Sequence, residues 1–273
     1  MALWQDGDLV IEEGKLHYYR TGGEKPPMIL LHGFSDDGLC WTRVAEVLEN
    51  DYDIIMPDAR GHGLSSDFPP IKFTLKDMAI DLIKLIQKIA VKSPVLMGHS
   101  MGARVAAYLA AAAPPLAGKL ILEDPEWNEQ LFHASKDDRF AKAEVVRNRI
   151  RNWKNMTPQQ IIVEFRRSQS VNWHKTDYTT WADSKVRVSP NAVGIIQTEA
   201  LPLNEIIPKI ACPTLLINGD TESGAILDKT TSESIRAINP KIQLCHIPSA
   251  SHHIRRDKFD LYMQAVKDFL HEA

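Results

Sequence analysis

The strongest constraint on the fold of this chain is an alternation of two kinds of segment. Short apolar runs alternate with longer segments in which apolar residues recur with the period of an α-helix. The first run, MILLHG, does not alternate between apolar and polar residues, so it is expected to be buried on both faces, and five further runs repeat that form. Buried strands separated by helices predict the α/β class, a mostly parallel twisted sheet flanked by helices. The six runs are residues 28–33, 53–58, 93–98, 119–124, 213–219 and 242–248.

The segments around these runs carry further strand and helix signals. A pair of strands is predicted ahead of the first run, and the clearest helix places its apolar side chains on one face and its lysines on the other. Thr74 and Asp77 give that helix a capping-box start. The strand pair is predicted at 8–13 and 15–20, and helices at 74–90, 102–113 and 258–273.

One long segment contains no strand signal and reads as several helices. We therefore predict an α/β core formed by residues 1–125 and 201–273, interrupted by a helical cap insertion at 126–200. Tryptophans in this insertion either anchor a small helical core or line a pocket over the sheet. They are Trp127, Trp153, Trp173 and Trp181.

Composition excludes several classes of partner. The 273 residues carry a formal net charge of -3, which gives no basic footprint for a nucleic acid. The three cysteines form no disulfide framework or zinc pair, and the acidic N-terminus does not resemble a signal peptide. No apolar stretch approaches the length of a membrane span. These features predict a cytoplasmic protein with no nucleic-acid or membrane partner, and they leave its oligomeric state open.

The sequence GHSMG places Ser100 between two glycines, with an apolar strand before it and a helix after it. This strand-turn-helix setting forces a serine into a strained, exposed turn, and the helix N-terminus below it favours negative charge. Gly98 and Gly102 leave room for the strand and helix to approach closely. The pattern therefore predicts that Ser100 is a nucleophile.

A nucleophilic serine needs donors for an oxyanion and a base for its proton. The backbone amide of Met101 is one expected donor, and Phe34, in the loop after the first buried strand, supplies the other. His252 lies in the loop between the last strand and the last helix, at the same edge of the sheet as Ser100, and is the expected base. His32, His62 and His99 sit in tight turns and are expected to satisfy backbone groups instead.

Four motifs, HGF, PDARGHGLS, GHSMG and ASHHIRRD, resemble those of the α/β-hydrolase-fold serine hydrolases. They stand in that family's order and together span nearly the whole chain outside the insertion, so the resemblance implies an α/β-hydrolase core. It also implies Ser100 as nucleophile and His252 as base, since the family's histidine follows a small residue as His252 follows Ser251. The amides of Phe34 and Met101 then form the oxyanion hole.

The acid that orients the histidine departs from the family's usual pattern. The family commonly places an aspartate three residues after the glycine of the LLING-type strand, where this chain has Glu222, while Asp220 directly follows Gly219. Some members use the end of the strand after the nucleophile helix, where Asp124 lies. Glu222 fits the spacing, Asp220 fits the residue type and Asp124 fits the second location. The sequence does not decide which of these three carboxylates orients the histidine.

The resemblance implies a serine esterase (carboxylesterase-like) that cleaves a small, partly apolar carboxylic ester or lactone through an acyl-enzyme. One alternative is a carbon–carbon bond hydrolase of ring-cleavage diketone acids, with a substrate carboxylate held in the cap. A second is a small-molecule receptor on the same fold. No phosphate-binding glycine loop and no metal-ligand spacing is found, so neither a cofactor nor a metal is expected. The candidate carboxylate-binding residues are Arg139, Arg147, Arg166 and Arg167.

Overall fold

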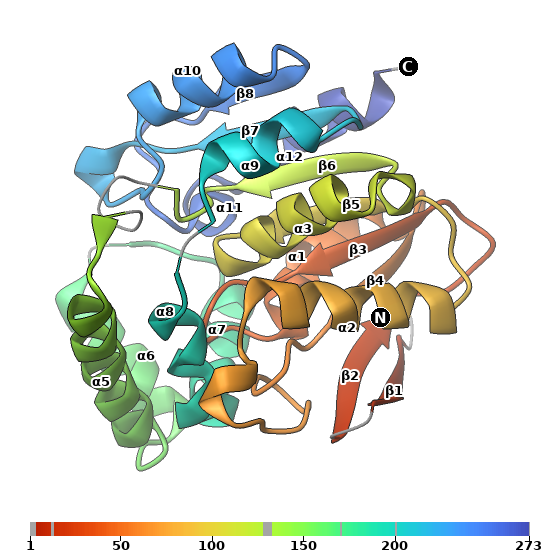
Figure 1. Cartoon of the computed structure of the whole chain (residues 1–273). Coiled ribbons are helices and arrows are strands. Elements are labelled where there is room, and N and C mark those ends of the chain that lie inside the picture. The colour runs from red at the N-terminus through yellow and green to blue at the C-terminus, as the bar shows by residue number, and fades with distance from the viewer. Residues whose placement is uncertain (1–3, 12–13, 128–132, 170, 200, 273) are drawn as a thin grey trace.

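The chain folds around one eight-stranded sheet with the strand order β1-β2-β4-β3-β5-β6-β7-β8 (Figure 1). The computed structural model describes residues 4–11, 14–127, 133–169, 171–199 and 201–272, so residues 12 and 13 of the predicted first strand lie outside it. β1 with β2 and β2 with β4 are antiparallel, and all other pairings are parallel, which confirms the predicted fold class. The strands are β1 Gln5–Ile11, β2 Gly14–Arg20, β3 Pro27–Leu31, β4 Asp53–Pro57, β5 Val95–His99, β6 Lys119–Glu123, β7 Thr214–Asn218 and β8 Ile242–His246.

Helices cover both faces of this sheet. α2 and α3 pack on one face with α9 and α10, and α1 and α12 pack on the other. The three helices predicted in the core are found as α2, α3 and α12, and the capping box at Thr74 and Asp77 is formed. The core helices are α1 Thr42–Leu48, α2 Leu75–Lys88, α3 Met101–Ala112, α9 Leu203–Ile206, α10 Lys229–Ile238, α11 Ile254–Asp257 and α12 Phe259–His271.

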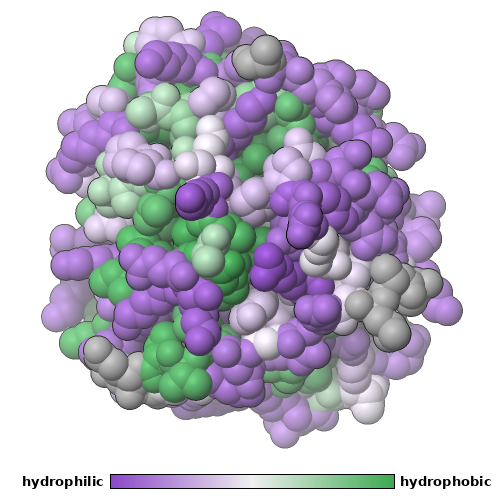
Figure 2. Space-filling view, turned by 90° about the vertical axis from the view of Figure 1, so that its right-hand side faces the viewer, coloured by the Kyte–Doolittle hydropathy of each residue, from purple (hydrophilic) through white to green (hydrophobic). Residues whose placement is uncertain are grey.

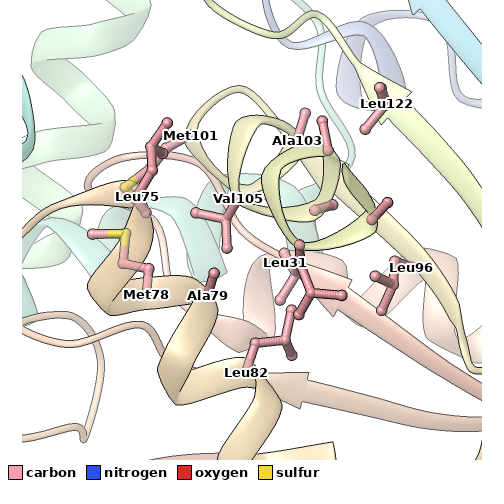
Figure 3. Packing of buried hydrophobic residues seen from close by; sticks show 14 of the residues in the cluster. Leu31, Leu75, Met78, Ala79, Leu82, Leu96, Met101, Ala103, Val105 and Leu122 are labelled. Atoms are coloured by element: carbon pink, nitrogen blue, oxygen red, sulfur yellow. The ribbon is translucent and has the colours of Figure 1, made fainter. Parts of the chain in front are cut away.

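Alternate side chains of the central strands enter two separate hydrophobic cores. In β3, Ile29 and Leu31 enter the core below α2 and α3, whereas Met28 and Leu30 enter the core below α1 and α12. Figure 3 shows Leu31 among side chains of α2 and α3. Successive residues of a strand point to opposite faces, so a strand between two helical layers must be apolar throughout. This explains the unbroken apolar runs of the sequence.

A group of helices between β6 and β7 lies beyond one end of the sheet (Figure 1). We call these the insertion helices: α5 Lys136–Trp153, α6 Pro158–Ser168, α7 Lys175–Arg187 and α8 Gly194–Gln197. On the face away from them, hydrophilic residues predominate and hydrophobic ones form smaller areas between them (Figure 2). Within the described ranges, no helix has both the length and the apolar character needed to cross a bilayer.

A buried ion pair fixes the segment after β8 against the end of β6. The Arg255 guanidinium donates to Glu123 at 2.9 Å, the Arg255 N–H donates to the same carboxylate at 3.0 Å, and both side chains are almost inaccessible to solvent. Burial raises the pKa of Glu123, and the contacts with Arg255 oppose that shift. Arg255 also lies over the ring of Trp41, 4.1 Å from its centroid. The pair therefore joins α11 to both the sheet and the layer of α1.

We predict that Arg255→Met lowers the free energy of unfolding by about 3–5 kcal/mol, because it leaves the Glu123 carboxylate buried without a counter-charge. Urea denaturation at neutral pH measures this change. Arg236→Met, on the exposed side of α10, is the matched control and is expected to change stability by less than about 0.5 kcal/mol. Equal stability of the Arg255 and Arg236 variants would contradict the prediction.

Candidate active site

Ser100 lies in the turn between β5 and α3. Its backbone has φ 52° and ψ -114°, a conformation that costs a non-glycine residue about 1–3 kcal/mol. Its N–H donates to the carbonyl of Glu123 at 2.9 Å, which holds the turn against β6. The serine is the N-cap residue of α3, where the helix dipole favours a developing negative charge.

Two glycines allow this turn because backbones meet there. A Cβ on Gly98 would lie 2.4 Å from the carbonyl oxygen of Gly102, and a Cβ on Gly102 would lie 2.2 Å from the carbonyl oxygen of Leu31. Both contacts are with backbone atoms, which cannot turn away as a side chain can. Side chains at either position would push α3 away from the sheet and move the serine with it.

Two residues that line the same cavity as Ser100 have backbone amides that are unpaired among the described residues. Phe34 follows β3, Met101 begins α3, and both residues line that cavity with Ser100. In the described part of the chain, neither the Phe34 N–H nor the Met101 N–H has a hydrogen-bond acceptor. The first N–H groups of a helix have no partner within the helix, which explains the free donor on Met101. Both amides are the oxyanion donors expected from the sequence, and both N–H groups are unpaired within the described ranges.

His252 and Asp124 form a short hydrogen bond across the edge of the sheet. Nδ1 of His252 donates to Oδ2 of Asp124 at 2.6 Å. The Asp124 carboxylate is fully buried and also accepts the N–H groups of Ile226 and Leu227, each at 2.9 Å. With the proton on Nδ1, the lone pair of the ring lies on Nε2. His252 also lines the cavity that contains Ser100.

Asp220 and Glu222, the other two carboxylates left open by the sequence, have different surroundings. Asp220 accepts the N–H of Ser249 at 2.6 Å and lies 3.0 Å from Nε2 of His246. These contacts hold the loop that precedes His252. Glu222 is exposed on the short 3₁₀ turn Thr221–Ser223. The structure therefore brings Asp124, and neither Asp220 nor Glu222, to the imidazole of His252.

The three remaining histidines of the strand-end turns satisfy backbone groups, as expected. Nδ1 of His32 donates to the Gly33 carbonyl and Nδ1 of His62 to the Arg60 carbonyl, each at 2.8 Å. His99 donates from Nε2 to the carbonyl of His252, also at 2.8 Å, and so positions the His252 backbone. Burial lowers the pKa of all three imidazoles, and that of His62 falls to about 3. Burial therefore favours the neutral form of all three rings.

A cavity of about 830 Å³ lies between the end of the sheet and the insertion helices and contains Ser100 and His252 in its wall. Trp153 and Trp181 line it, whereas Trp127 is buried in the core below α3. Trp173 and Trp181 also pack together within the insertion helices. Trp181 therefore has both predicted roles, whereas Trp127 has neither, because it belongs to the core below α3.

The cationic residues predicted from the sequence are placed differently. Of the four arginines considered, Arg139 lines the cavity, and Arg147, Arg166 and Arg167 do not. Arg166 instead lies over a tyrosine ring, 4.1 Å from its centroid. Arg104, which the sequence analysis missed, also lines the cavity and is 6% exposed. Its position four residues after the predicted nucleophile, on the same helix face, was the available signal.

The described residues contain no group of three or more His, Cys, Asp or Glu side chains placed to hold a metal ion. What the site does contain is a serine on a strained turn, a histidine hydrogen-bonded to a buried carboxylate, and two unpaired amides. These groups together can carry out nucleophilic attack on a carbonyl carbon.

Comparisons with a family profile, with known sequences and with solved structures all find hydrolases of the same fold. The sequence profile described as alpha/beta hydrolase fold matches residues 26–256. N-formylmaleamate deformylase of Pseudomonas putida is 26% identical over 264 residues, which cover 93% of this chain and 92% of that protein. The crystal structure of E-2-(acetamidomethylene)succinate hydrolase has a TM-score of 0.78 at 20% identity, over 98% of this chain and 100% of that one. A malate-bound esterase from Thermogutta terrifontis has a TM-score of 0.77 at 25% identity, over 97% and 98% of the two chains.

We predict that His62→Asn makes stability less dependent on pH below 6.5. The folded pKa of His62 is about 3 and its unfolded value is 6.5, so its contribution is fully present above pH 6.5 and is lost as the pH falls towards 3. The amide of the introduced asparagine can donate to the same carbonyl but does not titrate. The slope of unfolding free energy against pH should fall by up to about 1.4 kcal/mol per pH unit between pH 6 and 4.

Urea denaturation at a series of pH values measures that slope. His271→Asn, at the exposed end of α12, is the control and should leave the slope unchanged. An identical slope in the wild type and the His62 variant would show that His62 is not the source of the acid sensitivity.

Proposed function

The chain belongs to the alpha/beta hydrolase family, and from that premise we propose that it is a serine hydrolase that acts through an acyl-enzyme on Ser100. The observation that carries the proposal is the placement of Ser100, His252 and two free amides at one cavity, with Asp124 behind the histidine. A serine in that setting has a base, an orienting acid and an oxyanion site, which are the three requirements of acyl transfer.

In the first half of the proposed reaction, Nε2 of His252 removes the proton of the Ser100 hydroxyl. The oxygen then attacks the substrate carbonyl carbon, and the amides of Phe34 and Met101 donate to the oxyanion that forms. When the tetrahedral intermediate collapses, the leaving group departs with the proton held by His252. An ester now joins the acyl group to Ser100, and the imidazole is neutral again.

Water completes the reaction by the same route. His252 takes a proton from the water, the hydroxide attacks the acyl-enzyme, and the proton returns to the Ser100 oxygen as the acid product leaves. We assign the orienting role to Asp124, because its carboxylate holds Nδ1 of His252 protonated and stabilises the imidazolium. Three hydrogen bonds fix that carboxylate, so it does not need to reorganise between the two half-reactions.

We propose a small, partly apolar carboxylic ester or lactone as the substrate, with the insertion helices acting as a cap. Trp153, Trp181 and Ile195 support an apolar contact surface in the cavity. The names of two relatives favour a substrate that also carries a carboxylate, since one is a deformylase of N-formylmaleamate and the other is an esterase with malate bound. The name of the deformylase places amides beside esters as candidate bonds.

The first test is Ser100→Ala. We expect this variant to lose both the hydrolysis of a short p-nitrophenyl ester and labelling by a fluorophosphonate probe, because no other oxygen occupies the strained turn. Steady-state kinetics and labelling of the purified protein measure the two. Hydrolysis or labelling that survives in the variant rules the assignment out.

A panel of esters, lactones, N-acyl amides and diketone acids, assayed with the wild type, defines the bond cleaved. Cleavage of the diketone acids alone would identify a carbon–carbon bond hydrolase, which can use the same groups. Slow turnover of every compound together with ligand-dependent thermal shifts would favour a receptor.

The second test compares Asp124→Asn with Asp220→Asn. Asparagine at 124 favours the wrong tautomer of His252, so kcat should fall by about 10⁴-fold, the loss that the same change causes in a Ser-His-Asp protease. Asparagine at 220 keeps a group that can accept the Ser249 N–H and should change kcat by less than about threefold. Stopped-flow or steady-state assays with one ester measure both variants. A larger loss in the Asp220 variant would transfer the acid role to Asp220.

A further inference from the structure

Arg104 lies one helical turn after Ser100 on the same face of α3. Its N–H donates to the Ser100 carbonyl at 3.1 Å, and the residue lines the catalytic cavity. Side chains of a helix lean towards its N-terminus, which here is the end that carries the serine. Four residues correspond to about 6 Å along the helix axis. The backbone of Arg104 is thus held one helical turn from that of Ser100, and both residues line the same cavity.

The Arg104 guanidinium is buried with few partners. It has five N–H donors, but within the described ranges the side chain makes one long contact, 3.5 Å to Glu126. Glu126 is partly exposed and also binds Lys142 at 3.0 Å, so it is shared between two cations. Burial lowers the pKa of Arg104, and Glu126 opposes this shift only in part. A buried cation with unused donors is costly unless a ligand completes its hydrogen bonds.

Other cations of the cavity wall have partners or are exposed to solvent, as Arg149 is. Arg139 donates to the backbone carbonyl of Ala134 at 2.7 Å and contacts that of Gln197 at 3.3 Å. Lys185 donates to Asp36 at 2.8 Å. Lys142 is largely exposed and can be hydrated. Arg104 therefore differs from these cations because it combines burial with donors that the described residues leave open.

We propose that Arg104 is the subsite for a carboxylate carried by the acyl group of the substrate. This inference rests on the proposed function for the position of the scissile carbonyl, which is bound at Ser100. The planar fork of arginine matches a carboxylate with two parallel hydrogen bonds. The separation from Ser100 selects a short acyl chain between the two groups. The substrate class is thus a monoester or monoamide of a short dicarboxylic acid, and Glu126 keeps Lys142 as its partner when the substrate carboxylate binds.

The test compares two esters that differ in one group. In 4-nitrophenyl butyrate and mono-4-nitrophenyl succinate the acyl chains have four carbons, and a terminal methyl in the first is a carboxylate in the second. After subtraction of the uncatalysed rates, the wild type should favour the succinate ester in kcat/KM. Arg104→Met should lower the succinate-to-butyrate ratio by about 10-fold or more, because a charge-assisted pair is lost. Arg104→Lys keeps the charge without the fork and should give an intermediate ratio.

Arg151→Met is the matched control, since Arg151 is an exposed arginine of α5 that does not line the cavity. It should leave the ratio at its wild-type value. Circular dichroism confirms that each variant is folded. A wild-type enzyme without preference for the succinate ester, or an Arg104→Met variant with an unchanged ratio, would overturn the proposal.

Calorimetry separates this proposal from the proposed catalytic function. Succinate is titrated into Ser100→Ala and into the double variant Ser100→Ala with Arg104→Met, neither of which needs to turn over a substrate. Succinate should bind the first protein at least about 10-fold more tightly than the second. If Ser100→Ala still hydrolyses esters but this difference is present, the catalytic assignment fails and the anion subsite stands. Equal binding by both proteins refutes the subsite whatever the kinetics show.

Discussion

The carboxyl end of β6 holds the proposed catalytic residues together through two consecutive acidic residues. The carbonyl of Glu123 accepts the Ser100 N–H, and its carboxylate accepts both the backbone and the side chain of Arg255. The next carboxylate, that of Asp124, accepts His252. The nucleophile turn and the histidine loop are therefore positioned by the same short stretch of backbone. A substitution that shifts the backbone at this strand end would displace the serine and the histidine together.

A second buried charge cluster joins the insertion helices to the loop after β3 that carries Phe34, the proposed oxyanion donor; we call this segment the oxyanion loop. Asp36, two residues after Phe34, binds Lys185 of α7 and Arg256 of α11 at 2.8 and 2.9 Å. Burial alone would raise the pKa of Asp36, but these cations hold it well below its ordinary value. Lys185 also donates to the carbonyl of Ser35, next to Phe34, at 3.0 Å. Removing one member would leave the others as uncompensated buried charges, so α7 and the oxyanion loop are fixed as one unit.

Local signals explain how much could be predicted from the sequence. The apolar runs, the capping box at Thr74 and the GHSMG turn depend on neighbouring residues, and the fold class follows from them. The partner of His252 cannot be identified from neighbouring residues, because Asp124 and Asp220 both follow parallel strands at the same edge of the sheet. Asp220 contacts His246 and the Ser249 N–H instead, because the loop after β8 brings these groups next to it. No spacing in the sequence encodes that path.

Arg104 was not identified from the sequence for a related reason. A side chain on a helix face can bind a ligand only where a cavity lies over that face. The insertion helices create that cavity, and they supply its tryptophans. The position of Arg104 relative to Ser100 is nevertheless fixed by α3 alone, whereas Arg139 and Trp181 belong to the insertion helices. If Arg104 receives the acyl carboxylate, the core helix selects the length of the acyl chain. Contacts with the rest of the substrate are then left to the insertion helices, whose sequence can change without moving the anion subsite.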